Sequence, residues 1–592
     1  MRINRFILLS LSVLIAQASG KAFDTIIETD ADVMLTVRDI SELRKAWLEH
    51  PLVRDLGDAS LSEYFAPVFD EANDAESETD FKQLLDEFDL DEEELFELFS
   101  GQFGLALYNL PGLLLQDADK PDIAIMANFT GSADRLDELM QIQFERNAKA
   151  QQEVNPAIEH EMIEENFMGE TLYFDEVFDG EDTYIEDGYA LVDGVFILAR
   201  PEERLRSLVE SIKAGSEEPI ARSRPYQRVR EESGAVDLNL YMNLESVMPK
   251  LNKALLKQAT AGGMAMFGVS GQSLEAALAL EALQAISFNC KITEDGIASH
   301  SAIVYREKLG FLQLLTYEAG ALPAATYVPE DVLASTVARF DLSEMFARLE
   351  ALLGVASPNT PALINIQLQQ VKTNTGVDLR SALLENFGSE IVSFSVMPEG
   401  LPDENSFAQA EQVYVFEIKD AAALSGALEA LKDLVPGTRE QIRTRDFQGE
   451  TIHTIPGVAD PAMPDVPAYD FSYVVTRTHL IVCVGRVGLV QGVLTDMQSQ
   501  DAGFWQKAET RMLVDQVRHP DVVSRSYTDL EQVVVSLLES IASAGQLSGR
   551  GPSLDPSKLP SEMEIPWHLI TETYEAEDGI FSEMILLRKE GS

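Results

Sequence analysis

The chain has 592 residues, of which 45% are hydrophobic and 24% are charged. A single hydrophobic core stops growing at roughly 250 to 300 residues, so at least two domains are expected. The formal net charge of −54 argues against binding to nucleic acid phosphates or to an anionic membrane surface, because the summed field repels both.

The N-terminus has the features of an export signal. Arg2 and Arg5 precede an apolar run from Phe6 to Ala16, and small residues follow. We expect residues 1–20 to be a signal peptide, cleaved near Gly20. The alternative is an uncleaved anchor, but the run is shorter than the roughly 20 residues that span a bilayer. The mature protein is therefore expected to be periplasmic or extracellular, with no transmembrane segment.

The predicted elements of residues 21–307 alternate between strands and helices. In chain order they are a strand at 32–37, a helix from 39, an acidic helical region at 70–97, strands at 102–110 and 123–129, a helix at 136–144, a strand after 169, a hairpin at 189–199, a helix at 202–212, a strand that ends in 241–247, and a closing hairpin that turns at 294–297.

The second part of the chain repeats this order. Its elements are a helix from 341, a helical stretch at 377–387, strands at 390–396 and 413–418, a helix at 421–434, a strand after 449, a hairpin at 473–484, a helix at 487–497, a strand that ends in 527–533, and a hairpin that turns at 577–580. The most similar stretches are Phe167–Leu172 and Phe447–Ile452, which share Gly-Glu-Thr. One unit therefore occurs twice.

Caps and turns give local support to these elements. Asp39 and Asp341 each begin the pattern Asp-x-Ser-Glu, in which the Asp accepts from the first turn of a helix and the Glu reaches back. Asp193-Gly194 lies between two apolar runs, which is a strong hairpin signal because both turn positions need positive φ.

Tight turns between strands, with helices inserted, predict an α+β fold. We expect two tandem repeats, each a largely antiparallel sheet with helices packed on one face, arranged with approximate two-fold pseudo-symmetry. The predicted boundaries are 21–307 for the first repeat, 308–329 for a linker and 330–592 for the second repeat.

The copies differ most in two segments, an acidic insertion at 70–80 and a Pro-rich loop at 456–467. Loops carry function more often than the elements they connect, so a function specific to one half is expected there. The Gly-rich segments 261–271 and 540–560 are interpreted as flexible connectors or lids.

No cofactor or metal signature survives inspection. Gly263–Ser270 has the glycine spacing of a phosphate loop but Val269 at the lysine position. His160–Glu164 begins like a zinc-protease helix but has Glu164 at the second His, which favours a charged, solvated helix face. The acidic residues at Asp89 and Asp91 lack the glycine and final glutamate of a calcium loop.

Nucleophilic catalysis also lacks a candidate. The chain has no Gly-x-Ser-x-Gly elbow, and its seven histidines are scattered without ligand spacing. Cys290 and Cys483 each lie in a strand-like run, and two separate buried thiols are favoured over a bridge. An enzyme is therefore the less favoured class.

Glu170 and Glu450 are the only site candidates, because they are acids that both copies retain. A binding role is one interpretation. The structural alternative is favoured, in which Gly169 and Gly449 supply a turn or bulge and each Glu begins a strand.

With these motifs, the chain resembles a family of exported bacterial proteins catalogued only as a domain of unknown function. The resemblance depends on the Asp-Leu helix before a Gly and a strand, the Gly-Glu-Thr stretch, the hairpin followed by a helix, and Pro225-Tyr226-Gln227. It covers nearly all of the mature chain and implies no activity. The second copy has Phe504-Trp505 in place of Pro225-Tyr226.

Three functions remain open. The first is a non-enzymatic binding or scaffold protein with a protein partner, the second a carrier that holds an apolar ligand between sheet and helices, and the third a hydrolase whose site is assembled from distant residues. The first is favoured, because the architecture is duplicated without any duplicated chemistry.

Overall fold

The computed structural model describes residues 21–58, 90, 92–114, 121–261, 269–357, 359–397, 410–434, 438–457, 469–499, 503–517, 519–531 and 565–589. The chain divides into two compact units. The first contains residues up to 54, 65–254 and 283–306, and the second contains residues 55–64, 255–282 and 307–592.

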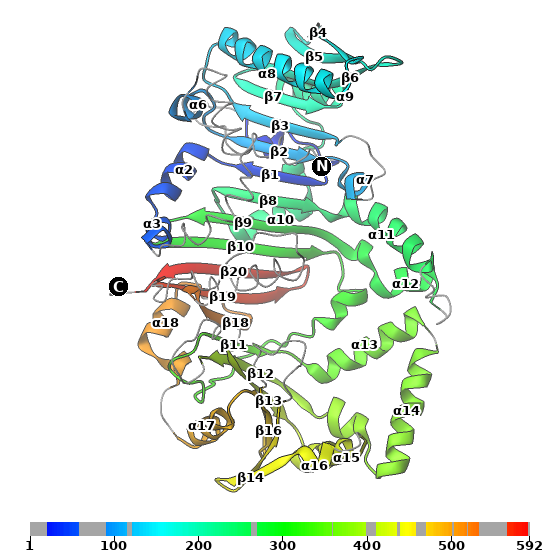
Figure 1. Ribbon diagram of the computed structural model, residues 1–592, viewed down its shortest axis with the longest axis vertical. Helices are drawn as coiled ribbons and strands as arrows, with labels where there is room; N and C mark the ends of the chain where they lie inside the picture. Colours follow the sequence, from blue (N-terminus) through cyan, green and yellow to red (C-terminus); the bar gives the residue numbers. More distant parts are fainter. Residues whose placement is uncertain are drawn as a thin grey trace. The chain divides into compact units, whose positions relative to one another are not determined.

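The first unit is built on a ten-stranded antiparallel sheet in the order β10-β9-β8-β1-β2-β3-β7-β6-β5-β4 (Figure 1). Its strands are β1 (Val33–Val37), β2 (Phe103–Leu107), β3 (Ile123–Asn128), β4 (Glu159–Phe167), β5 (Glu170–Phe178), β6 (Thr183–Val192), β7 (Val195–Arg200), β8 (Leu238–Asn243), β9 (Leu283–Ile292) and β10 (Gly296–Tyr305).

The second unit is also built on an antiparallel sheet, in the order β20-β19-β18-β11-β12-β13-β17-β16-β15-β14. Its strands are β11 (Ala334–Arg339), β12 (Phe387–Val396), β13 (Glu411–Ile418), β14 (Arg443–Phe447), β15 (Glu450–Ile455), β16 (Phe471–Val475), β17 (His479–Val484), β18 (Val522–Asp529), β19 (Trp567–Ala576) and β20 (Gly579–Arg588). Strand for strand, this order matches that of the first unit.

Helices and short turns connect these strands. They are η1 (Phe23–Thr25), α2 (Ile40–Glu49), α3 (Pro51–Asp58), α6 (Glu92–Leu98), α7 (Leu110–Leu114), α8 (Ala133–Val154), α9 (Glu202–Ala214), η2 (Ile220–Arg222), α10 (Arg224–Ser233), α11 (Leu244–Ala261), α12 (Gly271–Leu278), η4 (Leu280–Ala282), η5 (Gly310–Leu314), α13 (Leu342–Ala356), α14 (Thr360–Thr375), η6 (Arg380–Leu384), α15 (Ala421–Leu434), α16 (Thr438–Gln441), α17 (Val487–Gln498), η8 (Phe504–Gln506) and α18 (Ala508–Val514). The α+β class is therefore correct, and every described strand pairing is antiparallel.

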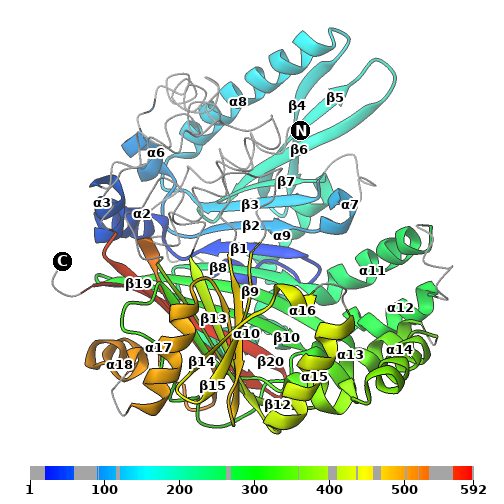
Figure 2. The ribbon, with the colours of Figure 1, turned by 60° about the horizontal axis from the view of Figure 1, so that its bottom comes forward.

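The expectation that helices cover one face of each sheet is wrong. In the first unit, Tyr189 on one face packs in a cluster with Leu136 of α8, whereas Arg206 of α9 lies over Phe174 on the other face. Figure 2 shows α8 and α9 on different sides of these strands. The physical reason is that β3 is apolar and buried at almost every position, so both of its faces need cover.

Hydrophobic cores of the two units use equivalent strands. In the first, residues of β2, β3, β6 and β7 pack with α6 and α8. In the second, residues of β12, β13, β16 and β17 pack with α17 and with η8. Each sheet thus forms the middle layer on which the helices are held.

Caps and turns agree with the sequence. Asp39 accepts from the backbone N–H groups of Ser41 and Glu42 at 3.0 and 3.1 Å, and Asp341 accepts from Glu344 N at 2.8 Å. Asp193-Gly194 has φ of 50° and 77°, the positive values that a two-residue hairpin needs.

The segment 308–329, which is predicted to be a linker, contains η5 and the buried residues Leu312 and Val328. The predicted signal peptide, the acidic insertion and the 540–560 segment lie outside the described residues, as do most of the 261–271 segment and the Pro-rich loop. In the described part of the chain, no helix has both the length and the apolar character needed to cross a membrane.

Candidate functional site: a cavity in the second unit

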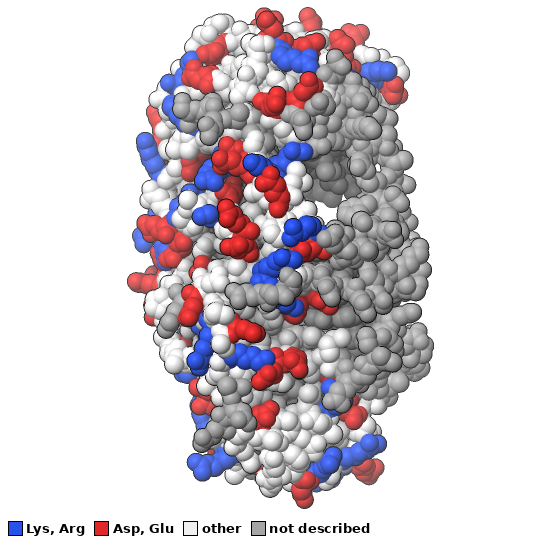
Figure 3. All heavy atoms as spheres, turned by 90° about the vertical axis from the view of Figure 1, so that its left-hand side faces the viewer, with Lys and Arg blue, Asp and Glu red and all other residues white. Residues whose placement is uncertain are grey.

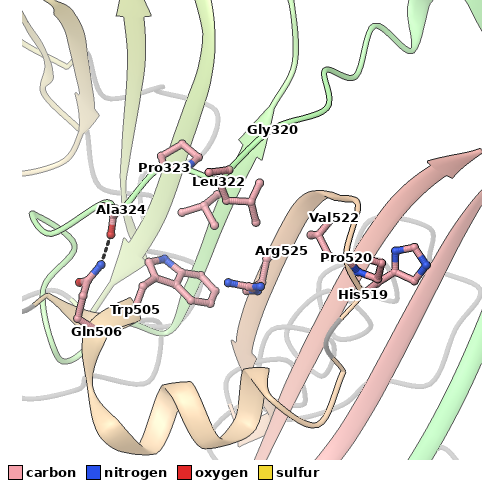
Figure 4. A pocket seen from close by; sticks show the side chains of 12 residues that line it. Gly320, Leu322, Pro323, Ala324, Trp505, Gln506, His519, Pro520, Val522 and Arg525 are labelled. Carbon is pink, nitrogen blue, oxygen red and sulfur yellow. Dashed lines mark hydrogen bonds between the residues drawn. The ribbon is translucent and has the colours of Figure 1, made fainter.

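The second unit contains a cavity of about 400 Å³. Part of its wall is apolar and is formed by Leu322, Pro323 and Trp505 (Figure 4). Its polar groups include the side chains of His519 and Arg525. The described residues that line it are Gly320, Ala321, Leu322, Pro323, Ala324, Val337, Trp505, Gln506, His519, Pro520, Val522 and Arg525. The cavity therefore offers apolar side chains together with hydrogen-bond donors, as ligand sites usually do.

Trp505 is held in place from two sides. Its indole Nε1 donates to Ser335 Oγ on β11 at 3.1 Å. The preceding Gly503 lies so close to the chain that a Cβ there would be 2.2 Å from the carbonyl oxygen of Thr326. The indole is thus a fixed wall of the cavity, and the loop that presents it depends on glycine.

Arg525 lies on β18 and pairs with Glu572, its neighbour on β19. Arg525 Nε donates to Glu572 Oε1 at 2.6 Å, and a terminal guanidinium nitrogen is 2.5 Å from the same oxygen. Glu572 is 0% exposed, so its charge depends on these partners. The pair fixes the guanidinium at the cavity while leaving it further N–H donors.

His519 is held by three contacts. Its ring stacks on Tyr574 with centroids 3.7 Å apart and planes inclined by 9°. Its Nδ1 accepts from Asp521 N at 3.3 Å, and its own backbone N–H donates to Glu572 Oε2 at 3.0 Å. In the neutral ring the proton then lies on Nε2, which makes that atom a donor.

The first unit places other residues at the equivalent position. Two residues before the tyrosine shared by β8 and β18, Asn239 stands where β18 has Arg525, and its β9 partner is Asn289. Asn239 Nδ2 donates to Thr36 Oγ1 at 3.3 Å. The charged pair is thus a feature of the second unit, and no sequence motif marks it. Two features of the sequence could have indicated this site. One is a charged residue within each of two predicted strands, and the other is Phe504-Trp505 at the place where the first copy has Pro225-Tyr226.

His160 lies in strand β4, so the expected solvated helix face is wrong. Its side chain is 1% exposed, and Nδ1 lies 2.9 Å from Asp175 Oδ1 on β5. Burial raises the pKa of Asp175, and the bond to His160 opposes this effect. The helix prediction failed because the side chains alternate between the two faces of a strand, and His160 and Met162 both lie on the face toward α8.

This His–Asp pair has the geometry of a catalytic base but no open access. His160 Nε2 is buried and has no hydrogen-bond partner, and Phe144 of α8 packs edge-on with the ring centroids 6.1 Å apart. A general base must reach the proton that it abstracts, and a buried Nε2 cannot meet a substrate without movement of α8. We therefore assign the pair a structural role.

Glu170 and Glu450 occupy identical places in their hairpins. Each follows a two-residue turn with φ of 54° and 89° at Met168-Gly169, and of 51° and 89° at Gln448-Gly449. The expected turn role of both glycines is confirmed. Glu170 Oε1 lies 2.5 Å from Lys213 Nζ of α9. The structure does not bring Glu170 or Glu450 into a polar cluster with the cavity residues, and a binding role for either stays a prediction.

A second difference between the units lies under α15. Tyr173 and Tyr189 stack in the first unit at 4.7 Å, and His453 and Tyr473 stack at 4.9 Å at the equivalent register. Beside the second pair Lys432 Nζ lies 3.2 Å from His453 Nδ1. Burial, followed by the charge of Lys432, lowers the pKa of His453. This cluster, too, was missed, because its members are far apart in sequence.

Both cysteines are free thiols. Burial raises the pKa of Cys483 to about 12 and also raises the pKa of Cys290. Each thiol is therefore protonated near neutral pH and is a poor nucleophile. Among the residues that the structure describes, no group of three or more His, Cys, Asp or Glu could hold a metal ion.

Charged side chains of both signs are interspersed on the face shown in Figure 3. Elsewhere in the described chain many charged side chains form ion pairs, and Arg204 with Asp30 and Asp122 is one example. Among the described residues, the excess acidic side chains thus do not form a cluster that could bind a metal ion.

Comparisons with known proteins give no family. No family model matches the chain, and no curated protein matches it. Among solved structures, crystal forms IV, I and III of TP0453 are similar over 48%, 51% and 52% of this chain and 81%, 88% and 90% of that chain. Identity is 9%, 10% and 10%, with TM-scores of 0.22, 0.21 and 0.22. Scores this low carry no argument, and the sequence resemblance described above stays a prediction.

Proposed function

We propose that the protein is an exported, non-enzymatic binding protein whose second unit holds a small organic ligand with an apolar body and a hydrogen-bond acceptor at one end. The observation that carries this proposal is the cavity that Trp505 and Leu322 line together with Arg525 and His519. The apolar wall would bury the ligand body, and the donors would orient its polar end.

The composition of the lining supports binding over covalent catalysis. None of the described residues that line the cavity carries a hydroxyl, thiol or carboxylate. Glu572 supports Arg525 from behind and already accepts three contacts, from Arg525 and from His519 N. A hydroxyl, thiol or carboxylate nucleophile would have to come from a ligand or from another part of the chain, and Nδ1 of His519 already accepts from Asp521 N.

The charge balance limits the ligand. Arg525 is paired with a buried carboxylate, so the cavity offers donors without a large net positive charge. We therefore expect an uncharged or weakly acidic acceptor rather than a phosphate. We also propose that the two units arose by duplication and pack with approximate two-fold symmetry. Ligand binding does not depend on this part of the proposal. The matching strand orders support the duplication.

Native mass spectrometry of mature protein purified from its own host tests the function. We expect a co-purified small molecule on the wild type and loss of that mass in Ala321→Phe, which adds a ring to the lining of the cavity. Ala150→Phe, at an exposed position of α8, is the matched control and should keep the ligand. A clean apo mass for the wild type, together with no binding of added 4-phenylbutyrate or its amide, would refute the proposal.

A further inference from the structure

The outermost strand of each sheet has an unpaired edge. β4 pairs only with β5, and β14 pairs only with β15, among the strands that the structure describes. Such an edge presents a row of free N–H and C=O groups, to which another strand can add.

These two edge strands carry opposite charges. On β4, Glu159 and Glu161 are exposed and, being two residues apart, share one face. On β14, Arg443 and Arg445 are exposed and share one face in the same way. None of the four forms an ion pair with another described residue, whereas Glu165 of β4 is bound by Arg206 at 2.7 Å.

The charge pattern decides which edges can meet. Two copies of β4 would place glutamates near glutamates, and two copies of β14 would place arginines near arginines. Like charges opposite one another destabilise a strand pair, and opposite charges stabilise it. We propose that β14 of one copy adds to β4 of a second copy, so that the protein associates with itself head to tail.

This contact is heterologous, because it joins two different surfaces of the same chain. After the first contact one copy keeps a free β4 edge and the other a free β14 edge, so growth does not stop at a dimer unless a ring closes. The proposal is independent of the cavity.

The net charge of −54 makes two copies repel each other, so the strength of association should depend on the salt concentration. The Debye length is about 10 Å at 0.1 M salt, so moderate salt screens repulsion between whole molecules more than attraction between side chains about 5 Å apart. Association is therefore expected to rise from very low to moderate salt and to fall again at high salt.

Sedimentation velocity of the full mature chain over a concentration series tests the proposal. We expect species larger than a dimer for the wild type at moderate salt. The double variants Arg443→Glu/Arg445→Glu and Glu159→Lys/Glu161→Lys should each associate about tenfold more weakly, because two attractive pairs become repulsive.

Mixing the two variants provides the decisive control. One variant then has two acidic edges and the other two basic edges, so the equimolar mixture should regain wild-type association. Misfolding would not be repaired by mixing, and circular dichroism of each variant checks the fold directly. A wild type that stays monomeric throughout, or variants that associate as the wild type does, would overturn the proposal, as would a mixture that fails to associate.

Discussion

The Arg525–Glu572 pair lends itself to a quantitative test, because the first unit provides its neutral counterpart. Replacing Arg525 with Asn leaves the carboxylate of Glu572 buried without its cation. The double variant Arg525→Asn/Glu572→Asn reproduces the Asn239–Asn289 pair that the equivalent strands carry. The single change removes a charge partner, whereas the double change removes the buried charge as well.

The expected magnitudes differ. Removing one partner of a buried pair costs about 3–5 kcal/mol, because an uncompensated charge remains in the interior. Glu572 is fully buried and is held by short contacts to Arg525, so we expect the single variant to reach this range. The double variant should recover most of the loss and end within about 1 kcal/mol of the wild type, since replacing both partners is often nearly neutral.

Tryptophan fluorescence can follow the second unit in urea. Trp505 and Trp567 belong to that unit and Trp47 to the first. Because Trp47 is exposed, Trp47→Phe gives a background in which the signal reports on the second unit. Equal midpoints for the single and double variants would show that the buried carboxylate does not need Arg525, and the reasoning would then fail.

Three further predictions concern single groups. Burial lowers the pKa of His568 to about 4 in the folded protein, whereas the unfolded ring titrates near 6.5. The free energy of unfolding should therefore fall by about 2 kcal/mol between pH 6.5 and pH 4. In urea titrations, His568→Gln should make the free energy of unfolding depend less on pH over this range. Glu170→Gln should lower the urea midpoint slightly, because it loses its ion pair with a lysine of α9, and Glu450→Gln should lower it less; a larger decrease for Glu450→Gln would contradict the assignment of the ion pair as the cause. Cys290 and Cys483 should react with a thiol reagent slowly in the native protein and at two equivalents per chain in denaturant, whereas a value near zero would reveal a disulfide.

Local sequence signals predicted elements well wherever short-range chemistry sets the structure. The helix at 421–434 and the Asp193-Gly194 turn follow directly from apolar spacing and from the need for positive φ. Asp39 and Asp341 cap helices as their patterns indicate. These features depend on residues that are neighbours in the chain, so one sequence suffices to find them.

The candidate site depends on register, which local patterns do not provide. Arg525 meets Glu572 only because β18 and β19 pair with one particular alignment. Trp505 reaches Ser335 across 170 residues. The sequence pattern predicts a helix at His160, because a strand with charged residues on both of its faces resembles the solvent-exposed face of a helix. Function is also expected at the loops where the copies differ, and these lie almost entirely outside the described residues, so that expectation stays a prediction.

The most direct test of the binding proposal is ¹⁹F NMR of the mature protein labelled with 5-fluorotryptophan, titrated with 4-phenylbutyrate or its amide. The chain has three tryptophans, and only Trp505 lines the cavity. A saturable shift of the Trp505 resonance, with those of Trp47 and Trp567 unmoved and with no shift in Ala321→Phe, is the predicted result. A Trp505 resonance that stays fixed at saturating probe, or that moves equally in Ala321→Phe, would contradict binding in this cavity.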